Sequence, residues 1–88
     1  MAKVNVKYFG LFRELIQKDE EKISANTIEE VIKNLVDKYR IKEYFNEKTG
    51  SDPNLILTHN GRIVSSKDYG IKLKDGDEIF IMSIISGG

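Results

Sequence analysis

The sequence predicts an α+β domain, in which one main helix packs on one face of a mixed sheet of four or five strands. Three observations predict this class. Residues 3–8 alternate polar and apolar side chains, which is typical of a strand with one buried face. Residues 28–39 repeat apolar side chains at helical spacing. Asn60-Gly61 is a strong hairpin signal, because both positions of the turn favour positive φ.

The first half of the chain is expected to hold two strands and two helical segments. Residues 3–8 form the first strand, residues 11–16 form a short helical turn, and residues 22–25 form a weaker strand with few apolar positions. Thr27 can cap the main helix, and Glu30, three residues later, can complete a capping box. The apolar stripe of this helix comprises Ile28, Val31, Ile32, Leu35, Val36 and Tyr39.

The second half is expected to be irregular over residues 41–54 and then to form three strands. Residues 55–59 and 62–64 flank the hairpin turn. A second turn, at residues 74–77, leads into the last strand, residues 78–83. This strand is apolar at four successive positions, which is typical of a central strand covered on much of both faces.

The order of these elements predicts the topology. A single main helix lies between two groups of strands, so we expect the first and last strands to lie parallel in the middle of the sheet, joined by a right-handed crossover. That is a β-grasp, or ubiquitin-like, arrangement. Residues 1–82 would form this domain, and residues 83–88 would form a flexible C-terminal Gly-Gly tail.

Composition argues against several classes of function. The 88 residues suffice for one domain. The 14 basic and 14 acidic residues cancel, which argues against nucleic acid as the main ligand. Without cysteine there is no thiol nucleophile, and His59, the single histidine, cannot build a zinc site without several carboxylates. We find no signal peptide and no apolar run near the ~20 residues that span a membrane. We therefore expect a cytoplasmic protein with no metal and no membrane association.

Few residues are candidates for catalysis. Asp75, Asp77 and Glu78 cluster at a turn, but they do not follow the spacing of a calcium-binding loop. Ser65 has no base unless His59 serves, and a hydroxyl without a base is a poor nucleophile. We therefore expect these residues to have structural roles.

The C-terminal sequence is the most distinctive feature. Gly87 and Gly88 follow the apolar residues Ile84 and Ile85, with one serine between. Six extended residues, 83–88, reach roughly 20 Å, and glycines, which lack Cβ, can thread a narrow channel. A terminal carboxylate is ionised at neutral pH and can attack an activated phosphate. The tail is therefore expected to act as a substrate carried by the folded domain, with Gly88 as the reacting group.

An apolar contact surface is expected beside the tail. Phe80 and Met82 alternate with two isoleucines in the last strand, so one of these pairs must face away from the helix. Exposed apolar patches often mark interfaces. The residues expected to contact a partner are Met82, Ile84, Ile85, Ser86 and Phe80, with Phe9, Phe12 and Arg13 as weaker candidates. The alternative for Arg13 is a surface pair with the neighbouring glutamate.

Four segments resemble a known family. They read VKYFGLFREL at residues 6–15, NGR at 60–62, LKDGDEI at 73–79 and SGG at 86–88. In this order, the segments resemble the MoaD/ThiS family of ubiquitin-like sulfur carriers over nearly the whole length, and most of all the small subunits of molybdopterin synthase. The Arg-Glu pair in the first segment favours that branch over the shorter thiamine carriers.

The resemblance implies a role in sulfur transfer. In such families an adenylating enzyme, related to those that activate ubiquitin, uses ATP and Mg to adenylate the terminal carboxylate, here that of Gly88. Sulfur then displaces AMP and leaves a thiocarboxylate. The large subunit of molybdopterin synthase would receive the tail and pass the sulfur to a pterin precursor of the molybdenum or tungsten cofactor. The chain would be the non-catalytic small subunit and would bind no cofactor itself.

The branch of the family stays open at this point. The molybdopterin carriers often have two prolines where this chain has Ser83 and Ile84, which is closer to the thiamine type. Residues 41–54 are longer than in compact members and resemble archaeal relatives that modify proteins. The alternatives are a carrier for thiamine, cysteine or tRNA thiolation, a modifier joined to lysines through Gly88, and an interaction module with an inert tail.

Overall fold

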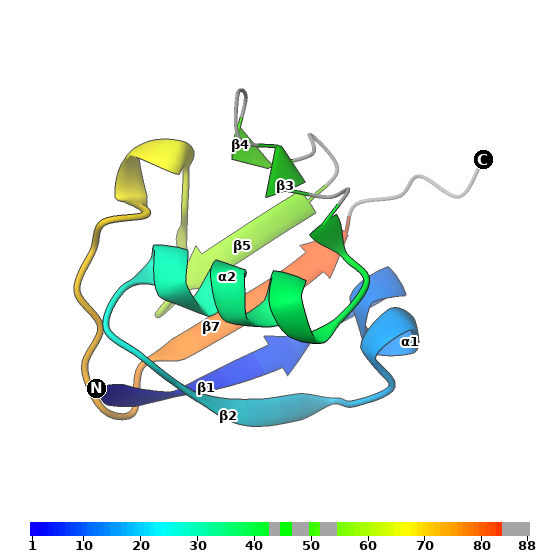
Figure 1. Cartoon of the computed structure of the whole chain (residues 1–88), viewed down its shortest axis with the longest axis horizontal. Helices are drawn as coiled ribbons and strands as arrows, with labels where there is room; N and C mark the ends of the chain where they lie inside the picture. Colours follow the sequence, from blue (N-terminus) through cyan, green and yellow to red (C-terminus); the bar gives the residue numbers. More distant parts are fainter. Residues whose placement is uncertain (43–44, 47–49, 52–54, 84–88) are drawn as a thin grey trace.

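The computed structural model describes residues 1–42, 45–46, 50–51 and 55–83. Its main part is a five-stranded mixed sheet with the main helix across one face (Figure 1). The elements of this part are β1 (Ala2–Tyr8), α1 (Leu11–Ile16), β2 (Glu20–Ala25), α2 (Ile28–Lys38), β5 (Leu55–His59), β6 (Arg62–Ile63) and β7 (Glu78–Ser83). Across the sheet the order is β2-β1-β7-β5-β6. The predicted α+β class and β-grasp arrangement are confirmed.

The first and last strands lie side by side in the centre of the sheet. β1 and β7 are parallel, with Asn5 opposite Glu78 and Tyr8 opposite Ile81. β2 pairs antiparallel with β1, and β5 pairs antiparallel with β7. Because both edges of β7 are paired, it is the central strand that its apolar sequence predicts.

The core lies between the sheet and α2. Val4, Val6 and Tyr8 of β1 are buried, and Ile79 and Ile81 of β7 join them. The buried residues of α2 are Ile28, Val31, Ile32 and Leu35, while Val36 and Tyr39 pack against the core partly buried. A fully buried aliphatic side chain contributes about 1.5–3 kcal/mol, so the packing of these two layers is the main stabilising term.

The N-terminus of α2 is capped as predicted, with one difference. The hydroxyl of Thr27 accepts a hydrogen bond from the backbone N–H of Glu30 over 3.3 Å. The carboxylate of Glu30 accepts from the backbone N–H of Asn26 over 2.8 Å, one residue before the cap. The reciprocal bond of the predicted capping box is therefore displaced by one residue, and it still satisfies an amide at the start of the helix.

A carboxylate at the edge of the core joins three elements. Glu21 of β2 accepts hydrogen bonds from the hydroxyl of Tyr8 at 2.6 Å, the hydroxyl of Tyr39 at 2.5 Å and Nζ of Lys38 at 2.7 Å. Burial opposes ionisation of this side chain, but the three hydrogen bonds outweigh it and lower the pKa of Glu21 to about 2. Burial and the bond to Glu21 raise the pKa of Tyr8, which stays protonated as the donor.

The hairpin prediction is confirmed, whereas the prediction for residues 41–54 is partly wrong. Asn60 and Gly61 have φ of 49° and 87°, as a tight two-residue turn requires. Within the segment expected to be irregular, β3 (Phe45–Asn46) and β4 (Gly50–Ser51) form a separate antiparallel pair. A short 3-10 helix, η2 (Ser66–Asp68), lies between β6 and β7.

Candidate functional site

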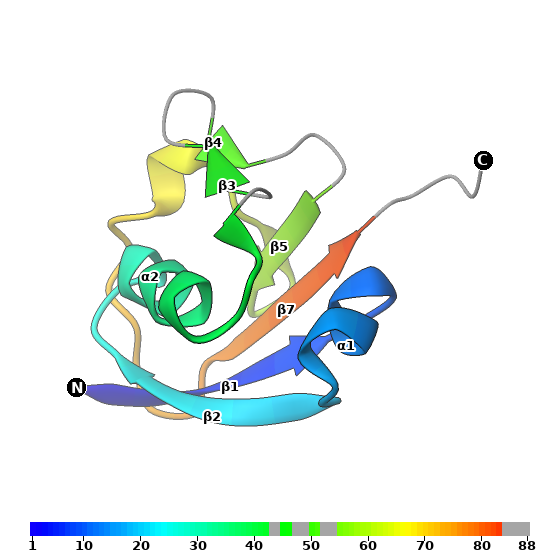
Figure 2. The same ribbon diagram turned by 45° about the vertical axis from the view of Figure 1, so that its right-hand side comes forward.

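The face of the sheet opposite α2 carries partly exposed apolar side chains. Figure 2 shows α2 lying against one side of the sheet. On the other side, the register places Phe80 of β7 beside Lys7 of β1, and Met82 opposite Ile56 of β5. Ile63 of β6 is 74% exposed, and the strand register aligns it with Phe80 across the sheet, nearer the sheet edge.

The aromatic side chains on this face contact one another. The ring centroids of Phe9 and Phe80 are 5.4 Å apart, and Phe9 is 42% exposed. Nζ of Lys7 lies 5.5 Å from the Phe80 centroid and 3.2 Å from the carboxylate of Glu78. We define the outer apolar patch as Phe9, Ile56, Ile63, Phe80 and Met82. A solvated sheet face is normally polar, so this patch has the character of an interaction surface.

The patch includes the end of β7, the last described strand. Met82 is the penultimate residue of β7, which ends at Ser83. The predicted reacting residues Gly87 and Gly88, and the predicted contact residues Ile84, Ile85 and Ser86, lie outside the described residues. Five further residues extend at most about 17 Å. An enzyme that reacts with Gly88 must therefore come close to the end of β7, next to the patch.

Two of the weaker contact predictions have different outcomes. Phe12 is fully buried in the core, so the prediction that it contacts a partner is wrong. It lies four residues from buried Ile16, on the inner face of α1. Arg13 stays on the surface, where Nε lies 2.8 Å from a carboxylate oxygen of Asp19, and not beside Glu14. Because both side chains are largely exposed, this ion pair contributes little to stability.

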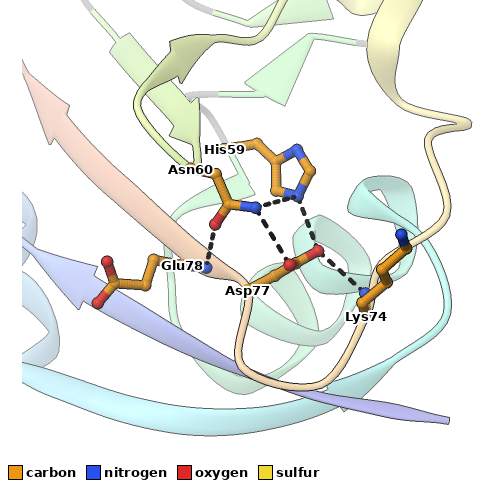
Figure 3. Close-up of polar contacts among 5 residues, drawn as sticks. All are labelled: His59, Asn60, Lys74, Asp77 and Glu78. Carbon is orange, nitrogen blue, oxygen red and sulfur yellow. Dashed lines mark hydrogen bonds and ion pairs between the residues drawn. The ribbon is translucent and has the colours of Figure 1, made fainter.

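The carboxylate of Asp77, in the turn before β7, joins this turn to the end of β5 and to the hairpin that follows (Figure 3). The carboxylate of Asp77 accepts hydrogen bonds from Nε2 of His59 at 2.9 Å, Nδ2 of Asn60 at 3.1 Å and the backbone N–H of Lys74 at 2.9 Å. Oδ1 of Asn60 accepts from the backbone N–H of Glu78 at 2.8 Å. Burial of Asp77 opposes its ionisation, but these bonds, first that of His59, lower its pKa to about 2.

The sequence did not reveal that His59 pairs with Asp77, and this pair has a structural role. The hydroxyl of Ser65 donates to Asp68 at 3.2 Å, within the cap of η2, and not to the histidine. Asp75 accepts from the backbone N–H of Lys3 at 2.8 Å. In the described ranges, no group of three histidine, cysteine or acidic side chains is placed to hold a metal. No helix in the same ranges is long and apolar enough to cross a membrane.

The fold and the patch define the class of protein. A β-grasp domain with an exposed apolar patch at the end of its central strand, followed by a Gly-Gly sequence, has the architecture of a ubiquitin-like carrier. The ThiS family model matches residues 6–88. The chain therefore belongs to the ThiS family, and the predicted resemblance to the ubiquitin-like sulfur carriers is confirmed. No curated protein sequence is significantly similar to it.

Solved structures from several organisms are similar over nearly the whole chain. The Pyrococcus furiosus protein described as molybdopterin converting factor subunit 1 is 31% identical with a TM-score of 0.77, covering 97% of this chain and 100% of its own. Small archaeal modifier protein 1 from Methanosarcina acetivorans is also 31% identical, with a TM-score of 0.80 and coverage of 100% and 98%. A chain in the complex of subunits 1 and 2 of molybdopterin-converting factor from Helicobacter pylori is 26% identical, with a TM-score of 0.67 and coverage of 98% and 99%.

Proposed function

We propose that this chain is the sulfur-carrier subunit of a molybdopterin synthase and carries sulfur as a thiocarboxylate on Gly88. The observation that carries the proposal is the outer apolar patch at the end of β7, together with the Gly-Gly sequence that follows this strand along the chain. The similarity to subunit 1 of the molybdopterin converting factor from Pyrococcus furiosus, and to a chain in the molybdopterin-converting factor complex from Helicobacter pylori, supports the choice of pathway. The product would be the molybdenum or tungsten cofactor, made in the cytoplasm.

The chemistry explains why such a carrier needs an activating enzyme. A carboxylate is a poor electrophile, because its oxygen is a poor leaving group. The activating enzyme would transfer AMP from ATP·Mg to the carboxylate of Gly88 and release pyrophosphate. Hydrosulfide from a sulfur donor would then attack the carbonyl carbon, form the C–S bond and displace AMP as the C–O bond breaks, which leaves the thiocarboxylate and releases a proton. In this scheme the chain supplies the reacting group and the docking surface, while the enzyme supplies the nucleotide and the metal.

Delivery of the sulfur would use the same surface. We infer that the large subunit of molybdopterin synthase receives the tail in its own active site, with Ile84, Ile85 and Ser86 in the entrance. Phe80, Met82 and Phe9 of the outer apolar patch would pack against the outside of that entrance, and Arg13 would lie near its edge. Docking would hold the thiocarboxylate sulfur beside the pterin precursor and so raise its effective concentration.

Intact mass spectrometry tests the first step. The chain is incubated with its cognate activating enzyme, ATP and a sulfur donor, and we expect one exchange of oxygen for sulfur at Gly88. A variant with one residue added after Gly88 should keep its fold and receive no sulfur. The matched control, Gly70→Ala, should react normally. An extended variant that still receives sulfur would contradict the assignment of Gly88.

The second candidate is a protein modifier joined to lysines through Gly88. The similarity to small archaeal modifier protein 1 from Methanosarcina acetivorans, at the same 31% identity, favours it. Carriers for thiamine, cysteine or tRNA thiolation are further alternatives in the family. Copurification of a large subunit and conversion of the precursor to molybdopterin would support the first candidate. Peptides in which Gly88 is linked to a lysine side chain would support the second.

A further inference from the structure

The charges on the outer face of the sheet are unevenly placed. On β1 and β2, the residues that alternate with the buried ones include Lys3, Lys7 and Lys22. Lys7 pairs with Glu78 beside the outer apolar patch. Lys3 and Lys22 lie farther from the patch, near the start of β1, and have no ion pair among the described residues. Besides Glu78, the outward-facing carboxylate on this part of the sheet is that of Glu20 on β2. The chain as a whole has no net charge, so this basic end is a local feature.

The register brings the two lysines together. Lys3 lies opposite Ser24, and Lys22 lies opposite Asn5, so the two lysines are diagonal neighbours on one face. Such neighbours are about 7–8 Å apart. The carboxylate of Asp75 is bonded to the backbone N–H of Lys3, and no contact joins it to the ammonium group among the described residues. An anionic partner would therefore find two adjacent ammonium groups available.

The basic end and the outer apolar patch fit within one interface. The six residues of β7 span about 17–20 Å. A standard protein interface covers about 800 Å² on each partner, which corresponds to a disc about 30 Å wide. An interface of this size, centred on the patch, is therefore wide enough to cover Lys3 and Lys22 as well, which lie on the same face of the sheet.

We propose that Lys3 and Lys22 steer and hold an acidic surface of the enzyme that activates Gly88. This inference rests on the proposed function and adds the charge of the partner surface to it. We assign the activating enzyme to this surface, because every later use of a carboxylate requires that its oxygen first becomes a leaving group. A surface that binds the activating enzyme is therefore needed in each of the sulfur-transfer and modifier pathways considered above. Opposite charges beside an apolar contact raise association rates and select partners.

Charge reversal tests this inference in the complete chain. We expect the double variant Lys3→Glu and Lys22→Glu to raise the KM for the carrier about tenfold at low ionic strength, with kcat of pyrophosphate release unchanged. The difference should shrink at high salt, because exposed charges are then screened. The matched control is Lys33→Glu with Lys67→Glu, which changes the net charge equally at exposed positions on α2 and η2. Its KM should stay near that of the parent.

A milder variant guards against misfolding. Lys3→Gln with Lys22→Gln should raise the KM in the same direction by a smaller factor, and circular dichroism should show the parent fold for all variants. The inference is overturned if the Lys3/Lys22 and Lys33/Lys67 charge-reversal variants change the KM equally, or if kcat falls while the KM stays the same. It is also overturned if the Lys3/Lys22 variant is activated normally and is impaired only in the later transfer of sulfur to an acceptor. A parent chain that is not adenylated at all would overturn the proposed function, whereas an adenylated chain with a normal KM in the Lys3 and Lys22 variants would overturn this inference alone.

Discussion

Nε2 of His59 lies 2.9 Å from a carboxylate oxygen of Asp77, and this contact joins the end of β5 to the turn that precedes β7 (Figure 3). The pKa of Asp77 is about 2, so its carboxylate is ionised at neutral pH and can only accept. Nε2 is therefore the donor. Asp77 immediately precedes β7, so this bond helps to position the start of the strand that carries Phe80 and Met82 of the outer apolar patch.

Replacing Asp77 should destabilise the domain. Asp77→Ala removes the acceptor of His59, Asn60 and the backbone N–H of Lys74 at a site that is largely shielded from water. We expect a loss of about 1–3 kcal/mol in the free energy of unfolding, measured by urea denaturation at pH 7. Asp37→Ala, at an exposed position of α2, should change it by less than about 0.5 kcal/mol. Equal values for the two variants would show that the network is not a stabilising one.

Glu21 should make stability depend on pH in the acid range. Its pKa is lowered from 4.5 to about 2 in the folded chain, so the unfolded chain binds more protons between these values. The stabilisation is therefore complete above about pH 5 and is lost as the pH falls towards 2. The free energy of unfolding, followed from pH 6 to pH 2, should fall less steeply for Glu21→Gln than for the parent. Glu29→Gln, at an exposed site on α2, should keep the parental slope.

Gly61 of the hairpin turn can be compared with Gly70, because both glycines have room for a Cβ and differ in backbone conformation. A Cβ added at Gly61 or at Gly70 would meet nothing within 4 Å, but only Gly61 has a positive φ, of 87°. Gly61→Ala should therefore cost about 1–2 kcal/mol through backbone strain. Gly70→Ala should be neutral or slightly stabilising, since it reduces the freedom of the unfolded chain. Thermal unfolding of both variants measures the difference, and equal midpoints would contradict the strain argument.

The outer apolar patch should carry much of the binding energy of the activating enzyme. Phe80→Ala removes the ring that contacts Phe9, and we expect binding to weaken by about tenfold or more, as for a central aromatic residue of an interface. Isothermal titration calorimetry measures the affinity. Ile71→Ala is the control, because Ile71 is 39% exposed and lies beside the N-terminus of α2, where its carbonyl accepts from the backbone N–H of Ile28. If both variants bind like the parent, the patch is not the docking surface.

The elements that were predicted well are those with enough residues to show a period. The alternation over residues 3–8 and the stripe of α2 each run through several positions, and both were found where expected. β3 and β4 have two residues each, which is too short for any alternation to appear. The six residues of α1 likewise do not show which side is buried, so Phe12 was placed on the surface although it belongs to the core.

The class of the fold, the position of the tight turn and the family can be predicted from the amino-acid sequence, because they depend on local periods, turn chemistry and short motifs in a fixed order. The three-dimensional packing is needed to show that Phe80 and Met82 face away from α2, since the two faces of a uniformly apolar strand look alike in the sequence. It also decided the partners of Glu21 and Asp77, which come from other strands and from α2. Such contacts depend on how the strands register across the sheet, and that register is set by the packing of the whole core.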